Sequence, residues 1–74
     1  MNWSLAAISH TGATISVADV TPAVSLLMEQ YPNQADAHID LVMKQEARRR
    51  GASYASLLRR EGNKTTVEAD YWLN

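Results

Sequence analysis

The sequence predicts a small α+β fold, in which a small antiparallel sheet is packed by two or three helices. Three observations predict it: two N-terminal segments alternate apolar and polar residues, the central part repeats apolar residues at helical spacing, and the C-terminal residues alternate again. The chain has 74 residues, which is enough for one domain and no more. We therefore expect residues 1–74 to form a single compact domain.

Residues 3–8 and 13–17 are expected to form an N-terminal β-hairpin. One side of each segment is apolar, through Trp3, Leu5 and Ala7 and then Ala13, Ile15 and Val17. The connecting residues 9–12 read Ser-His-Thr-Gly, and Gly12 can take the positive φ that a tight turn often needs. The hairpin would have one apolar face and one face lined with serine and threonine.

The first of two central helices is expected to begin at Thr21-Pro22 and to end before Pro32. Threonine can cap the unpaired N–H groups of a first turn, and proline at the first helical position gives up no hydrogen bond. Pro32 ends the helix because a proline disfavours the α conformation of the residue before it. The apolar stripe of this helix comprises Val24, Leu27, Met28 and Tyr31.

The second helix is expected over residues 34–50, and Gly51 is a suitable residue to end it. Its three final arginines suit the negative end of the helix dipole. Asp40–Lys44 and Glu46–Arg50 are favourable pairs four residues apart. The apolar stripe comprises Ala35, Ile39, Val42, Met43 and Ala47.

Residues 53–61 allow two interpretations. Ser53 could cap a short helix that carries Tyr54, Leu57 and Leu58 and closes at Gly62, or the same residues could form a strand that turns at Gly62-Asn63. We favour the helix slightly and leave the strand open.

Residues 65–73 are expected to form a strand, because Val67, Ala69, Tyr71 and Leu73 alternate with polar residues. The simplest sheet pairs this strand with the N-terminal hairpin, and the helices then cover the apolar face of the sheet. Such a sheet could bring Trp3 and Trp72, which lie near opposite ends of the chain, close together.

Composition and charge bound the function. The net charge of −1 gives no global field that would attract nucleic acid or anionic lipid. The chain has no cysteine, no apolar run of the ~20 residues that span a bilayer, and no basic, apolar start typical of a signal peptide. We expect a cytoplasmic protein with no membrane partner.

No motif indicates catalysis, so we expect the chain not to be an enzyme and to need no cofactor. It lacks the Gly-x-Ser-x-Gly sequence of hydrolases and any glycine-rich phosphate loop. A chain this short also struggles to form a water-excluding pocket of ~300 Å³. Asp36-x-His38-x-Asp40 is not expected to bind a metal, because on a helix His38 lies about 200° around the axis from both aspartates.

Every lysine and arginine lies between positions 44 and 64, on a chain that is otherwise neutral or acidic. Charge segregated in this way often becomes a patch on the folded surface, which could meet phosphates or an acidic protein. A simpler interpretation is that helix ends recruit cations. Trp72 falls on the polar side of the last strand and could anchor an interface. The candidate partner-binding residues are Arg48, Arg49, Arg50, Arg59, Arg60, Lys64 and Trp72.

Residues 47–60, Ala-Arg-Arg-Arg-Gly-Ala-Ser-Tyr-Ala-Ser-Leu-Leu-Arg-Arg, resemble the inter-helix turn of ribbon-helix-helix DNA-binding proteins. The resemblance implies a serine-capped second helix with its N–H groups near a DNA phosphate. The chain departs from that family before the first helix, where residues 31–34 read Tyr-Pro-Asn-Gln instead of a basic-polar strand. It is also similar in type, though in no motif, to small phage-encoded proteins that bind and regulate host RNA polymerase.

The sequence therefore favours a non-catalytic binding protein. Its partner would be another protein, and the similarity in type implies a transcription regulator acting on host RNA polymerase. The alternative is a nucleic-acid-binding domain that uses the basic 44–64 segment. A dimer that completes a thin core by self-association is a third possibility.

Overall fold

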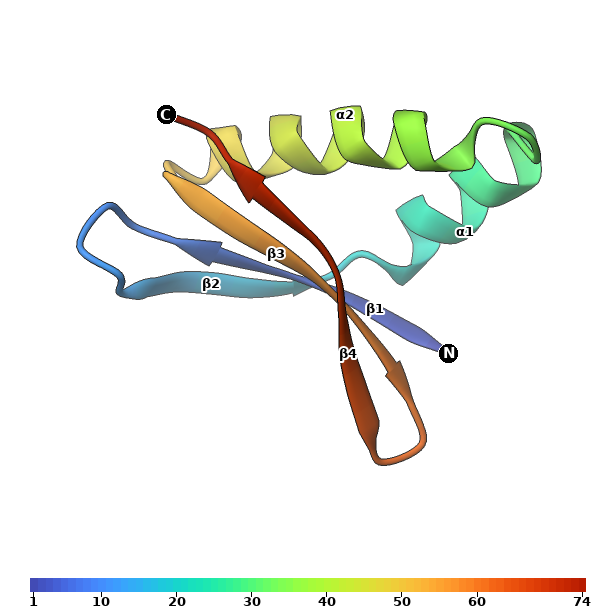
Figure 1. Ribbon diagram of the computed structural model, residues 1–74, viewed down its shortest axis with the longest axis horizontal. Helices are drawn as coiled ribbons and strands as arrows, with labels where there is room; N and C mark the ends of the chain where they lie inside the picture. Colours follow the sequence, from blue (N-terminus) through green and yellow to red (C-terminus); the bar gives the residue numbers. More distant parts are fainter.

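The computed structural model describes residues 1–74 and has the element order ββααββ (Figure 1). The strands are β1 (Asn2–Ile8), β2 (Thr14–Asp19), β3 (Tyr54–Glu61) and β4 (Lys64–Trp72), and the helices are α1 (Thr21–Gln30) and α2 (Ala35–Arg49). The four strands form one antiparallel sheet in the order β2-β1-β3-β4. The predicted α+β class, the pairing of the N-terminal hairpin and both central helices are confirmed. The expected single apolar face of the hairpin was wrong, because Val17 pairs with Ala6 and Ala18 with Leu5, so Val17 lies on the face opposite Leu5.

Residues 54–61 form a strand, so the favoured short helix at 53–61 was wrong and the alternative was right. In β3 the buried residues are Ala55 and Leu57, which share one face at a spacing of two. The turn at Gly62-Asn63 joins Glu61 to Lys64 directly, with positive φ at Gly62 and not at Asn63, as a type II′ hairpin requires. β3 pairs on both sides, and this pairing outweighs the local tendency to form a helix.

The expected pairing between the C-terminal strand and the N-terminal hairpin was also wrong, because β3 lies between them. β4 pairs only with β3 and is an edge strand. Trp3 is opposite Arg59 on the face that packs against the helices, whereas Trp72 is opposite Tyr54 near the other end of β3. The two tryptophans are therefore on opposite faces of the sheet.

Both helices pack against the same face of the sheet (Figure 1). The 15-residue α2 contacts β1 and β3, and the shorter α1 contacts β1 and α2. The buried core comprises Trp3, Leu5, Ala7, Val20, Val24, Ile39, Met43, Ala47, Ala52, Ala55, Leu57 and Tyr71. Neither helix is both long enough and apolar enough to cross a bilayer.

The start of α1 differs from the expected threonine cap. Val20 is the N-cap residue and makes no side-chain cap bond, while Asp19 Oδ1 accepts a hydrogen bond from the Thr21 amide at 2.9 Å. The Thr21 hydroxyl instead accepts a hydrogen bond from the Trp3 amide at 2.9 Å. Thr21 thus ties the start of α1 to β1, because the strand offers its hydroxyl a closer donor than the helix does.

Gly51 ends α2, as expected, with a φ of 77°. The Gly51 amide donates to the Arg48 carbonyl at 2.9 Å and the Ala52 amide donates to the Ala47 carbonyl at 3.1 Å, which is the Schellman pattern. The buried Ala52 then leads directly into β3. The backbone conformation at Gly51 therefore sets the direction in which β3 enters the sheet.

We expect Gly51→Ala to lower the free energy of unfolding by about 1 kcal/mol, because a side chain strains this left-handed conformation. A Cβ at this position would meet no heavy atom within 4 Å, so the loss comes from the backbone alone. Gly51→Asn should lose less, since asparagine tolerates the left-handed region better. Urea unfolding measures both losses, and an alanine variant as stable as the wild type would contradict the prediction.

Candidate functional site

Six of the seven basic residues between 44 and 64 lie in two groups at opposite ends of β3, and Lys44 lies within α2 (Figure 1). Arg48, Arg49 and Arg50 are at the end of α2, beside the start of β3, whereas Arg59, Arg60 and Lys64 are at the β3–β4 turn. Six residues of extended strand between Tyr54 and Arg60 span about 20 Å. The structure therefore does not bring the predicted basic residues together into one patch.

Four of the seven cations pair with carboxylates of the same chain. Lys44 pairs with Asp40 at 3.0 Å, Arg50 with Glu46 at 2.9 Å, Arg59 with Glu61 at 2.9 Å and with Glu68 at 2.5 Å, and Arg49 also with Glu46. Arg48, Arg60 and Lys64 make no ion pair. The expected Asp40–Lys44 and Glu46–Arg50 pairs are thus both present. Together, the ion pairs of these four cations offset much of the positive charge of the basic segment.

Trp72 is 76% exposed, which agrees with its predicted place on the polar side of the last strand. It lies on the sheet face that no helix covers, which we call the open face. Strand alternation and register place these side chains on the open face: Ala6, Ile8, Val17, Tyr54, Ser56, Leu58, Arg60, Val67, Asp70 and Trp72. Val17 and Val67 are also exposed, at 61% and 56%. Apolar side chains therefore occur on all four strands of the open face, interspersed with polar residues such as Ser4, Asp19 and Thr65.

A hydrogen-bonded group of three side chains lies beside Trp72. Asp70 Oδ1 accepts hydrogen bonds from the Tyr54 hydroxyl at 2.5 Å and from the Ser56 hydroxyl at 2.8 Å. These two bonds, the one from Tyr54 first, lower the pKa of Asp70 below its ordinary value. The Tyr54 and Trp72 rings are tilted against each other with centroids 4.4 Å apart. The carboxylate is therefore held in a fixed position next to an exposed aromatic pair.

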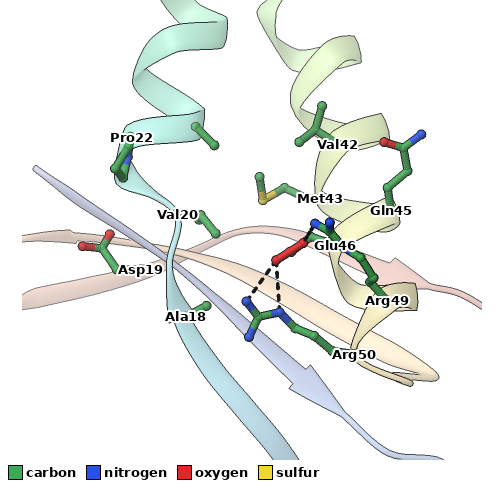
Figure 2. A pocket seen from close by; sticks show the side chains of 11 residues that line it. Ala18, Asp19, Val20, Pro22, Val42, Met43, Gln45, Glu46, Arg49 and Arg50 are labelled. Atoms are coloured by element: carbon green, nitrogen blue, oxygen red, sulfur yellow. Dashed lines mark hydrogen bonds and ion pairs between the residues drawn. The ribbon is translucent and has the colours of Figure 1, made fainter.

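The helix layer is narrower than the sheet, so it leaves a hollow on each side of α2. The larger one, about 580 Å³, lies between α2, the start of α1 and the end of β2 (Figure 2). Its apolar wall includes Val20, Val42 and Met43, and its polar wall is formed by Glu46 with Arg49 and Arg50 (Figure 2).

The charged groups of this hollow already have partners within the chain: Glu46 pairs with Arg49 and Arg50, and Asp19 accepts a hydrogen bond from Thr21. Hydrogen bonds from Arg50, and then from Arg49, lower the pKa of Glu46, and those from Thr21 lower the pKa of Asp19. Both acids are therefore ionised at neutral pH and are unsuited to donate a proton. No nucleophile is paired with a base here, so the hollow offers shape and charge but no assembled catalytic group.

The smaller hollow, about 300 Å³, lies on the other side of α2, above β4. Asp36, Asp40 and Glu68 are on its rim, and Tyr71 is in its wall. Burial, followed by the charges of Asp40 and Asp36, raises the pKa of Tyr71 to about 12. This phenol therefore stays protonated over the whole physiological range.

The side chains of Asp36, His38 and Asp40 do not converge. The His38 ring stacks on Tyr31 with centroids 3.6 Å apart, and Asp40 pairs with Lys44. Nowhere in the chain do three histidine, aspartate or glutamate side chains gather as a metal site would require.

A scan against protein-family models, a search of curated proteins and a search of solved structures each gave no match.

Sequence reasoning found Trp72 but missed Tyr54, Ser56 and Asp70. Tyr54 and Ser56 were placed on a short helix, where neither would be next to Asp70. The Gly62-Asn63 pair was the signal for the hairpin, but an unbroken hairpin at that point pairs Ser56 with Ala69. The irregularity between Leu57 and Leu58 shifts the register by one residue and brings Ser56 opposite Asp70, and no sequence signal marked it.

Proposed function

We propose that this chain is a non-catalytic binding protein that contacts another protein through its open face. The observation that carries the proposal is Trp72, whose exposed side chain stands on an uncovered four-stranded sheet. Tryptophan, tyrosine and arginine are the residues that most often anchor protein interfaces, and the open face carries one of each.

The surroundings of Trp72 support a protein partner. The apolar side chains Ile8, Val17, Leu58 and Val67 provide area on this face that gains by leaving water. The fixed carboxylate of Asp70 among them offers one oriented polar contact. Apolar area with a few placed polar groups is the usual composition of an interface core with its rim.

Nucleic-acid binding through the basic segment has less support. Its cations lie at two ends of β3, and four of the seven are paired with carboxylates. Affinity for phosphates depends on how many cations can act together on one backbone.

Site-specific photocrosslinking tests the proposal. We expect a photoreactive residue in place of Trp72 to give discrete protein adducts in native cells. The same residue in place of the exposed Ser25, on α1, should give none. Adducts with nucleic acid alone, or equal yields at both positions, would overturn the assignment of the open face.

A further inference from the structure

We propose that the open face binds the open face of a second copy of this chain, forming a two-fold symmetric dimer with reciprocal Arg60–Asp70 ion pairs. The inference rests on the proposed function, because it names the partner of the same surface.

The spacing of residues on β3 and β4 makes this surface self-complementary. Leu58 pairs with Val67, and the two charges lie on opposite sides of that pair along the strands. Asp70 is opposite Ser56, two residues before Leu58, and Arg60 is two residues after it. Consider a two-fold axis that lies between the two facing sheets and crosses the strands at the Leu58–Val67 pair. It places the Arg60 side of one copy over the Asp70 side of the other. Arg60 of each copy then faces Asp70 of the other.

The two charges have no ion-pair partner within one copy. Asp70 accepts hydrogen bonds from two neutral hydroxyl groups, which hold its carboxylate in place. Arg60 donates from Nε to the Gly62 carbonyl at 3.0 Å and meets no carboxylate. The neighbouring Arg59, on the covered face, pairs with two glutamates. An acid and a base thus remain unpaired on the one face that lacks a covering layer.

The distances suit facing sheets. Two sheets pack about 10 Å apart, which an arginine and an aspartate side chain can bridge. The same symmetry places Leu58 and Val67 of both copies at the centre and brings Trp72 against the β3–β4 turn of the other copy. Asp19, the other acid of this face, lies at the corner where β2 ends, and its carboxylate is turned to the Thr21 amide.

The area predicts a weak dimer. Four strands and about seven residues of strand length give a face of about 20 Å by about 22 Å, or about 450 Å² of projected area. Two copies therefore cover about 900 Å², near the lower limit for specific interfaces. We expect a dissociation constant in the micromolar to millimolar range.

Sedimentation equilibrium between about 1 μM and about 1 mM protein tests the inference, because this range brackets the affinity that such an area supports. Asp70→Lys and Arg60→Glu should each weaken the dimer about tenfold or more, since each turns two attractions into two repulsions. The double variant should restore the affinity to within about threefold of the wild type, because the reciprocal pairs form again with reversed sign. Glu29→Lys, a reversal on an exposed site of α1, should leave the dimer unchanged.

Two results would overturn the inference: a wild type that stays monomeric up to the highest concentration, or a dimer that neither reversal weakens. A variant could also lose the dimer because it misfolds. Arg60→Glu avoids this problem, because Arg60 is exposed and circular dichroism can verify that the variant is folded. The crosslinking result tests the proposed function separately from the dimer. A monomer that still gives adducts with other proteins at position 72 rejects only the dimer, whereas absence of any adduct at position 72 rejects the open face as a binding surface.

Discussion

Leu5→Ala is expected to lower the free energy of unfolding by about 3 kcal/mol, the usual loss when a leucine is truncated in a packed core. Leu5 is fully buried in the middle of β1, opposite Ala18 on β2 and Leu57 on β3. Its neighbours are held by strand pairing on both sides and cannot collapse into the cavity. A domain of this size has about 4 to 11 kcal/mol in total, so the variant should be largely destabilised.

Urea unfolding followed by tryptophan fluorescence measures this loss, because the buried Trp3 lies on the same strand. Leu41→Ala is the matched control, since Leu41 is 55% exposed on α2 and its truncation should cost at most about 0.5 kcal/mol. Equal losses for the two variants would show that β1 is not the centre of the core.

The second large effect is expected in alkali. The pKa of Tyr71 is about 12 in the folded chain, against an ordinary value of 10.0, because burial disfavours the phenolate. The unfolded chain therefore gives up this proton more readily than the folded chain does. The stabilisation is complete below pH 10 and is lost as the pH rises through 12, where the loss reaches about 2 kcal/mol.

Unfolding in urea at a series of pH values between 9 and 12 measures the loss. The difference in phenolate absorbance between the wild type and Tyr71→Phe gives the titration of Tyr71, because the chain has three tyrosines. Tyr71→Phe is the control: it keeps the buried ring and removes the titrating group, so the slope in this window should flatten. A variant with the same slope as the wild type would assign the alkaline loss to other groups.

The sequence was a good guide wherever one local rule decided the outcome. Pro32 and Gly51 bound the helices because their backbone preferences do not depend on the rest of the chain. The stripe that includes Ile39, Met43 and Ala47 predicted the buried side of α2, because helical periodicity alone fixes which side chains share a face. Gly12, with a φ of 89°, likewise marks the first hairpin.

The candidate site was less predictable, because it depends on strand pairing between distant residues. Nothing near Asp70 in the sequence indicates that Tyr54 and Ser56, sixteen and fourteen residues away, donate to its carboxylate. In the basic segment, by contrast, residues that are close in sequence lie far apart in the fold. Residues close in sequence were expected to form one patch, but β3 is an extended strand and carries Arg59 and Arg60 away from the arginines that end α2.

By itself, then, the sequence determined the α+β class, the limits of both helices, the N-terminal hairpin and the exposure of Trp72. These follow from periodicity and from single residues with strong backbone preferences. Only the tertiary structure decided that residues 54–61 form the inner strand β3, because their local pattern suits a helix or a strand almost equally. Pairing with β1 and β4 satisfies the backbone on both sides, and that pairing also creates the open face on which the proposed function depends.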